Sequence, residues 1–326
     1  MHHIIVDGWC SNMVTGGFVE YYKALASGVS MSDLKRSIME ERSSSSEYVD
    51  YIKWMENQDK RKARKYWKEL LEDYDNVADI NPVKKPALTN EQMMRKSVVI
   101  DKETTAKLME IVRKEQVTVN IIAEVTCGLL LQQYTKERDV VFGKVVSGRN
   151  ADINGIENIV GLFVNTIPVR VTIDENTSII EMIRNQHMQS IESSSYDYCS
   201  LADIQSDSNQ GSDLIKILLA YENYASGSNN EVPQEISEED LTFTMEHSRE
   251  QTDYMLSISS LCISDVFVFD VMYNPNRFCN EEIGIILERI EKICQEIANN
   301  PQQSASKIET VTEKEKALIL NDFNAT

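Results

Sequence analysis

The sequence lacks any long run of apolar residues. No stretch in its 326 residues reaches the roughly 18 consecutive apolar residues that indicate a transmembrane helix. Met1 is followed by two histidines and not by a basic segment that leads into an apolar one, so the start does not resemble a signal peptide. We therefore expect a cytoplasmic protein with no membrane partner. Its 42% hydrophobic content is enough for a sizeable core.

Cysteine motifs and clustered basic residues are also scarce. The six cysteines form no CxxC and no zinc-like spacing with histidine, which argues against a metal site or a disulfide framework. The net charge of −19 argues against a nucleic-acid partner, because such partners are bound through Lys and Arg. One basic stretch, DKRKARKYWK (59–68), is the exception. It is either a solvated helix face or a docking patch for an acidic partner.

Histidine is rare as well, yet two of the four histidines stand next to each other at His2 and His3. They open the segment HHIIVDG, in which Asp7 and Gly8 follow an apolar spacer. Histidine exchanges a proton near neutral pH, and a nearby carboxylate and glycine are typical of a base on a tight turn. A metal site is disfavoured, because adjacent side chains on an extended segment point to opposite sides. We predict that His3 acts as a base and that Asp7 fixes its loop.

The usual motifs of nucleophilic and nucleotide chemistry are absent. The chain has no GxSxG elbow, no cysteine-protease signature, no GxxxxGK[ST] loop and no GxGxxG that opens a helix. The predicted base therefore has no protein nucleophile beside it. It suits the removal of a proton from an attacking amine or hydroxyl.

The apolar pattern predicts an α/β layer architecture. We expect helices at 13–26, 43–71, 102–115, 119–134, 178–193 and 280–298, and strands at 96–100, 139–149, in the second half of 161–173, and at 213–223, 241–247, 254–262 and 265–274. Residues 75–86, with Pro82 and Pro86, are predicted to form a surface connection, and residues 225–235 a surface loop.

Several segments resemble, in order, the motifs of one family. HHIIVDGWC (2–10) resembles the HHxxxDGWS motif of the condensation domains of nonribosomal peptide synthetases, with Cys10 where the family usually has serine. The further matches are YVDYIKW (48–54) with Y-x-D-Y-x-x-W, VVSGRN (145–150) and IVGLFVNTIPVRV (159–171) with the glycine-arginine segment and V-G-x-F-V-N-T-x-P-x-R, SYDYCSL (195–201) weakly with H-Q-D-Y-P-F-E, and ETVTEKEKALILNDFNAT (309–326) with the linker to an adenylation domain. The resemblance covers nearly the whole chain.

The resemblance implies a chloramphenicol-acetyltransferase-like lobe, with a mixed β-sheet flanked by helices, and peptide-bond formation. A donor acyl or peptidyl thioester and an acceptor aminoacyl thioester would arrive on the phosphopantetheine arms of two peptidyl carrier proteins, with no cofactor bound directly. His3 would be the residue associated with bond formation, as a base or as a positioning group. Gly8 would permit a backbone turn and close approach of the substrate. His2 is expected to contribute through packing.

Asp7 is expected to hold the loop through an ion pair. We predict Arg149 as its partner, because an arginine after a glycine at a strand end can make a planar two-point contact with a loop carboxylate. Trp9, Asn165 and Thr166 are expected to line the tunnel between two lobes.

The resemblance also divides the chain. Residues 1–30 would be a catalytic turn and helix that remain from an N-terminal lobe, 31–95 a helical connection, 96–300 the C-terminal lobe, and 301–326 a linker toward an adenylation domain. The N-terminal motifs S-x-A-Q-x-R and R-H-E-x-L-R are not found, so we expect that most of that lobe is missing and that the isolated chain is inactive. The alternatives are an epimerisation-type domain and a non-catalytic lobe that binds carrier proteins.

Overall fold

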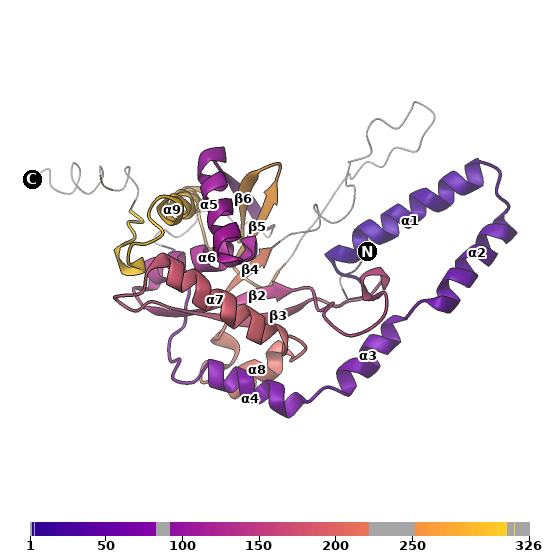
Figure 1. Ribbon diagram of the computed structural model, residues 1–326, viewed down its shortest axis with the longest axis horizontal. Coiled ribbons are helices and arrows are strands. Elements are labelled where there is room, and N and C mark those ends of the chain that lie inside the picture. Colours follow the sequence, from indigo (N-terminus) through magenta and orange to yellow (C-terminus); the bar gives the residue numbers. More distant parts are fainter. Residues whose placement is uncertain (1, 3, 83–91, 222–251, 312–315, 317–326) are drawn as a thin grey trace, which may run out of the picture.

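A six-stranded mixed β-sheet organises the part of the chain that the structure describes. The computed structural model describes residues 2, 4–82, 92–221, 252–311 and 316 (Figure 1). In chain order its elements are α1 (Gly8–Ala26), α2 (Met31–Ser44), α3 (Tyr48–Glu56), α4 (Lys60–Leu70), β1 (Met94–Ile100), α5 (Lys102–Glu115), α6 (Val119–Thr135), β2 (Asp139–Val146), β3 (Asn165–Thr172), α7 (Ile179–Ser194), α8 (Leu201–Asp207), β4 (Ile217–Tyr221), β5 (Leu256–Ile263), β6 (Val266–Tyr273) and α9 (Asn280–Asn299), with short 3-10 turns at Ile156–Asn158, Gly211–Asp213 and Ala305–Lys307. The mixed sheet with flanking helices is the predicted fold class.

The strand order is β1-β6-β5-β4-β2-β3. Strand β4 runs parallel to both of its neighbours, and the other pairs are antiparallel. Phe142 pairs with Val169, and Val98 with Phe269. Because side chains alternate across a strand, this register places one apolar row from each strand on the same face of the sheet.

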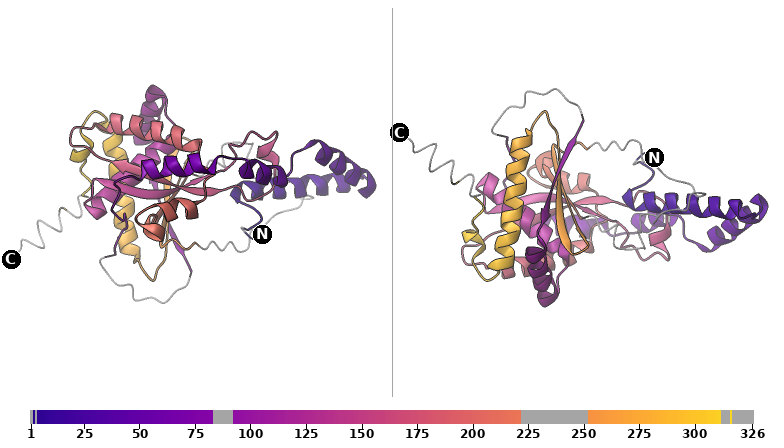
Figure 2. Two further views of the ribbon diagram at one scale, coloured as in Figure 1. Left: turned by 90° about the horizontal axis from the view of Figure 1, so that it is seen from below. Right: turned by 90° about the horizontal axis from the view of Figure 1, so that it is seen from above.

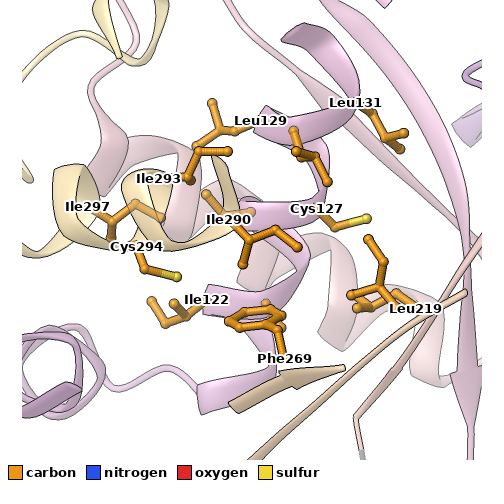
Figure 3. Packing of buried hydrophobic residues seen from close by; sticks show 14 of the residues in the cluster. Ile122, Cys127, Leu129, Leu131, Leu219, Phe269, Ile290, Ile293, Cys294 and Ile297 are labelled. Carbon is orange, nitrogen blue, oxygen red and sulfur yellow. The ribbon is translucent and has the colours of Figure 1, made fainter. Parts of the chain in front are cut away.

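That face carries the main core, beneath α5, α6, α7 and α9. Figure 3 shows part of it, where side chains of α6 and α9 pack near Leu219 of β4 and Phe269 of β6. Helix α6 is buried along most of its length, as its apolar sequence predicts, because it lies between the sheet and its neighbouring helices. Ile290 and Cys294 of α9 belong to the same cluster as Phe269 of β6. The cysteines are all free, and four of the six are buried.

Helices α4 and α8 cover the β2–β3 end of the opposite face (Figure 1). Trp67 of α4 is buried against this face, and its Nε1 donates a hydrogen bond to the Tyr196 carbonyl at 3.1 Å. The second core anchors the helical segment beneath β2 and β3, close to the strand ends at which the candidate site is built.

Helices α1 and α2 form an arm that projects away from the sheet (Figure 2). Phe18, Met31 and Met39 are large apolar residues that this arm leaves exposed. No helix in the described ranges is long and apolar enough to cross a membrane.

The first helix begins earlier than its apolar spacing predicts. It starts at Gly8 because the Asp7 side chain caps its first turn by accepting a hydrogen bond from Cys10 N. The helix predicted over 43–71 is in fact two helices, since the chain breaks after Glu56 and Asp59 caps α4. The short helix α8 was not predicted at all.

The predicted linker packs on the lobe at its start. Ser304 forms an isolated antiparallel β-bridge with Ser178. Ala305 and Ile308 are buried in the main core, so residues 301–311 pack with the sheet. The predicted strand 241–247 and loop 225–235 lie outside the described residues, as do Pro86 and most of 312–326.

Candidate functional site

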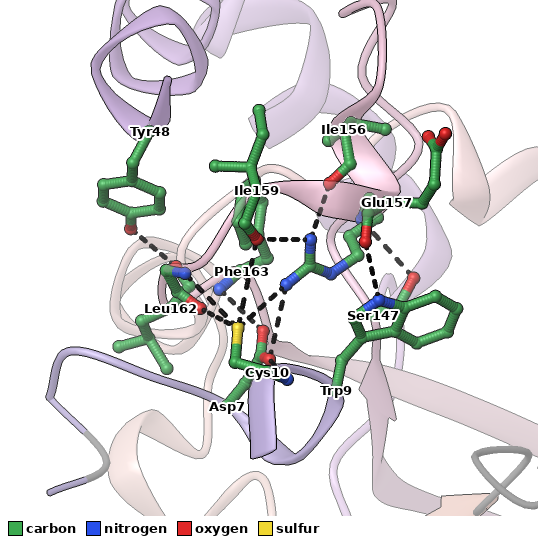
Figure 4. Close-up of polar contacts among 12 residues, drawn as sticks. Asp7, Trp9, Cys10, Tyr48, Ser147, Ile156, Glu157, Ile159, Leu162 and Phe163 are labelled. Carbon is green, nitrogen blue, oxygen red and sulfur yellow. Dashed lines mark hydrogen bonds and ion pairs between the residues drawn. The ribbon is translucent and has the colours of Figure 1, made fainter. Parts of the chain in front are cut away.

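Asp7 is buried at the point where the histidine segment enters α1. The residue is 2% exposed. Oδ1 accepts a hydrogen bond from Cys10 N, and Oδ2 accepts one from Phe163 N, both at 3.1 Å (Figure 4). The first bond caps the helix. The second ties the histidine loop to the segment that precedes β3.

Arg149 lies against this carboxylate, through one nitrogen and not through the predicted two-point contact. Its Nη2 is 3.4 Å from Asp7 Oδ1, and both side chains are almost fully buried. Nη1 donates to the carbonyls of Ile156 at 2.6 Å and Ile159 at 2.9 Å. One planar guanidinium therefore holds the histidine loop and the 156–159 turn together, a geometry that lysine could not reproduce.

Aromatic rings enclose the guanidinium. The Phe163 ring centre lies 4.0 Å from the guanidinium carbon of Arg149, and the Trp9 ring centre lies 5.6 Å away. Trp9 Nε1 donates to the Glu157 carbonyl at 2.9 Å. Cation–π contacts strengthen when water is excluded, so the rings stabilise the buried arginine. Trp9 thus packs on Arg149 in the described structure, and its predicted place in a tunnel wall stays a prediction.

Cys10 is a second tie between α1 and the segment before β3. Its buried Sγ donates to the Gly161 carbonyl at 3.2 Å and accepts from Gly161 N at 3.3 Å. Arg149 Nη2 also lies 3.2 Å from this sulfur. The thiol therefore serves as a hydrogen-bonding group within the protein, a role that the sequence analysis did not assign.

The YVDYIKW segment of α3 packs on the same place. Tyr48 Oη donates to the Leu162 carbonyl at 2.6 Å, and the Tyr51 ring lies 4.5 Å from the Phe163 ring between centres. Burial and the nearby Asp7 charge raise the pKa of Tyr48. Motifs that are far apart in the sequence thus converge on the Asp7–Arg149 pair.

Gly148 permits the loop crossing that brings Arg149 to Asp7. Its φ is +65°, and a Cβ at this position would lie 1.8 Å from the Phe163 carbonyl oxygen. We expect Gly148→Ala to lower the free energy of unfolding by about 3 kcal/mol or more, since left-handed backbone costs about 1–2 kcal/mol and overpacking adds about 1–3 kcal/mol. Chemical denaturation would measure the change.

A matched control is Gly16→Ala in α1, where an added Cβ meets nothing within 4 Å. The control should stabilise the helix by up to about 1 kcal/mol. Equal stability of Gly148→Ala and the wild type would show that the loop tolerates a Cβ at position 148, so that glycine is not required there.

The structure places the remaining residues of the histidine segment as follows. His2 is exposed, its Nδ1 accepts from Ile4 N at 3.2 Å, and its carbonyl accepts from Ile5 N to close a turn. The predicted packing role of His2 stays a prediction, because the lobe that would precede it is not part of this chain. His3 lies outside the described residues, so its role stays a prediction. Gly8 is the first helical residue of α1 and does not have a positive φ, and its predicted close approach to the substrate stays a prediction.

Asn165 is fully engaged within the protein. Its amide donates to the carbonyls of Asp197 and Cys199, each at 2.7 Å, and its Oδ1 accepts from Thr166 N at 2.8 Å. The side chain thereby fastens the 197–199 segment to the start of β3. The tunnel-lining role of Asn165 and Thr166 stays a prediction.

Asp197 is a buried carboxyl that the sequence analysis did not assign. It is 5% exposed, and its Oδ2 accepts a hydrogen bond from Asn150 Nδ2 at 2.7 Å. Burial raises the pKa of Asp197 to about 6, against the opposing effects of the Asn150 hydrogen bond and the Lys144 charge. The weak match of SYDYCSL to a family motif was the sequence signal that could have identified it.

The geometry defines a chloramphenicol-acetyltransferase-like α/β lobe in which a capped histidine loop is tied to the ends of two strands. The chain belongs to the condensation domain family, whose model matches residues 1–320. It is 33% identical to bacitracin synthase 3 of Bacillus licheniformis over 329 residues, and 32% identical to tyrocidine synthase 3 of Brevibacillus parabrevis over 328 residues. Each match covers 100% of this chain and 5% of the relative, so the chain spans a small part of these synthetases.

Solved structures agree on the fold. The X-domain from teicoplanin biosynthesis matches with a TM-score of 0.72 and 15% identity, over 95% of this chain and 70% of that one. The first condensation domain of the calcium-dependent antibiotic synthetase, in complex with substrate analogue 3a, matches with a TM-score of 0.66 and 15% identity, over 95% of this chain and 65% of that one.

Proposed function

We propose that this chain is the part of a condensation domain that carries the histidine motif, and that the complete domain forms peptide bonds in nonribosomal peptide synthesis. The observation that carries the proposal is the anchored Asp7 of the HHIIVDG motif: its carboxylate is held by Arg149 and Phe163 N within a chain of this family. A buried pair of this kind persists only where its partners are well placed. An anchored carboxylate four residues after His3 suits a motif whose histidine must meet a reacting amine.

In this proposal the substrates are two thioesters on phosphopantetheine arms. Donor and acceptor carrier proteins would deliver them, and an adenylation domain and an N-terminal lobe would be neighbours. The acceptor amine attacks the donor carbonyl, the C–N bond forms, and the donor thiol leaves. His3 would take the amine proton or hold the amine in line, and either role is general acid–base or positioning catalysis.

The test uses the synthetase that contains this chain, with its donor and acceptor carrier proteins loaded with different amino acids. We expect a dipeptidyl thioester on the acceptor carrier, detected by mass spectrometry. Bound carriers without any dipeptide would reject the proposal in favour of a non-catalytic carrier-binding lobe. Inverted stereochemistry of the donor without bond formation would reject it in favour of epimerisation.

A further inference from the structure

A cavity of about 220 Å³ lies beside Asp197, apart from the Asp7–Arg149 contacts. Its polar walls include Asn120 of α6, Lys144 of β2, Ser190 of α7 and Asn150 from the loop after β2, together with Asp197 itself. Pockets for drug-sized ligands are usually about 300–1,000 Å³. This cavity therefore suits a small group.

The charges around the cavity do not balance within the protein. The carboxylate of Glu124, which is 0% exposed, lies 3.0 Å from Lys144 Nζ and also accepts hydrogen bonds from Asn120 Nδ2 and Gln186 Nε2. Glu124 thus neutralises Lys144, and ionised Asp197 leaves a net negative charge. An anion would be repelled at such a site, whereas a cation is attracted.

The hydrogen bonds are incomplete on the acceptor side. Asp197 Oδ2 accepts from Asn150, and Oδ1 has no hydrogen-bond donor among the described residues. Asn120 Oδ1 is buried and also has no partner in the described part of the chain. Buried polar groups are seldom left unpaired in a folded protein. The cavity therefore offers the free carboxylate oxygen of Asp197 to a ligand that donates hydrogen bonds.

We propose that this cavity binds a primary ammonium group of a small ligand, with Asp197 as its counter-ion. An ammonium carries the positive charge and the several N–H donors that the walls lack. A divalent metal fits less well, because such metals need several oxygen ligands and a single free carboxylate faces the cavity.

The cavity is joined to the histidine loop by two short segments. Consecutive residues Arg149 and Asn150 bind Asp7 and Asp197 respectively, while Phe163 N binds Asp7 and Asn165 binds the Asp197 carbonyl. A bound amine would thus be fixed relative to the loop that carries the histidines. The identification of this amine with the acceptor of condensation rests on the proposed function, whereas the ammonium site itself does not.

The test is an NMR titration that measures the binding of three small probes to the purified chain. The probes are L-alanine methyl ester, which has an α-amine, Nα-acetyl-L-lysine methyl ester, which has only a side-chain amine, and N-acetyl-L-alanine methyl ester, which has neither. Both amines should bind and the neutral ester should not. Tighter binding of the alanine ester identifies an α-amine as the natural ligand, and tighter binding of the lysine ester identifies a cationic side chain. Equal binding of the neutral ester would overturn the proposal.

Asp197→Asn should weaken binding of the better amine by about tenfold or more, as expected for loss of a charged hydrogen-bond partner. The control Asp152→Asn removes the same charge from an exposed position and should bind as the wild type does. Should Asp197→Asn not fold, Ser194→Leu narrows the cavity and keeps its charges, and it should also abolish binding. Unchanged affinity in the folded variant would overturn the proposal.

These measurements separate the two proposals, because binding needs no turnover. Amine binding without dipeptide formation would reject the proposed function alone. Dipeptide formation by a chain that does not bind amines would reject the ammonium site alone.

Discussion

His3→Ala is expected to lower dipeptide formation by roughly two to four orders of magnitude, the range for loss of a positioned acid–base group. The Asp7 carboxylate, Arg149 and Phe163 N fix the loop four residues further on, so the loss should fall on the chemical step and leave the fold intact. Single-turnover assays with loaded carrier proteins would measure it, with thermal unfolding as the check on stability.

His187→Ala provides a control for this variant. His187 lies on α7 and is only partly buried, and its replacement should change turnover little. Wild-type rates in His3→Ala would remove the histidine from the mechanism. A large loss in both variants would point to a general effect of histidine removal on the fold.

Breaking the Asp7–Arg149 pair should have the second largest effect. We expect Asp7→Asn and Arg149→Ala each to lower the free energy of unfolding by about 3–5 kcal/mol, because each strands a buried polar partner. Both should also lower turnover by displacing the histidine loop. The double variant should cost little more than either single variant, since both remove the same interaction.

Two further variants sharpen this experiment. Arg149→Lys should behave like Arg149→Ala, because one ammonium cannot reach the carboxylate and the carbonyls of Ile156 and Ile159 together. Arg64→Ala removes an arginine whose partner Asp207 lies near the surface, and it should cost at most about 1 kcal/mol. Additive losses in the Asp7/Arg149 double variant would show that the two side chains act separately.

The sequence predicted those features that depend on local pattern. The apolar run of α6 indicated burial, and the arginine after Gly148 indicated a partner for Asp7. The fold class followed from alternating helices and strands. These are periodicities and short motifs, which a single sequence contains.

The features that the sequence analysis missed depend on partners far along the chain. Asn165 binds carbonyls 32 and 34 residues away, and Cys10 binds Gly161 across 151 residues. Backbone groups have no sequence signature, so nothing in the pattern could name them. Asp197 was missed for the same reason, because its burial depends on how the 197–199 segment folds against β3.

The contacts around the Asp7–Arg149 pair have a consequence for the design of chimeric condensation domains. Residues 7–10, 48–51 and 147–165 hold one another through side chains and backbone groups from three separate parts of the chain. A chimera whose crossover falls between these segments would combine residues from two parents whose side chains do not match, even if every motif were kept. An exchange that takes residues 7–165 from one parent keeps these contacts together, although Asn165 and Asn150 still require a matching 197–199 segment. The segments that should be exchanged together are therefore those that contact one another, residues 7–165 with the 197–199 segment, and motif boundaries are a poor guide to them.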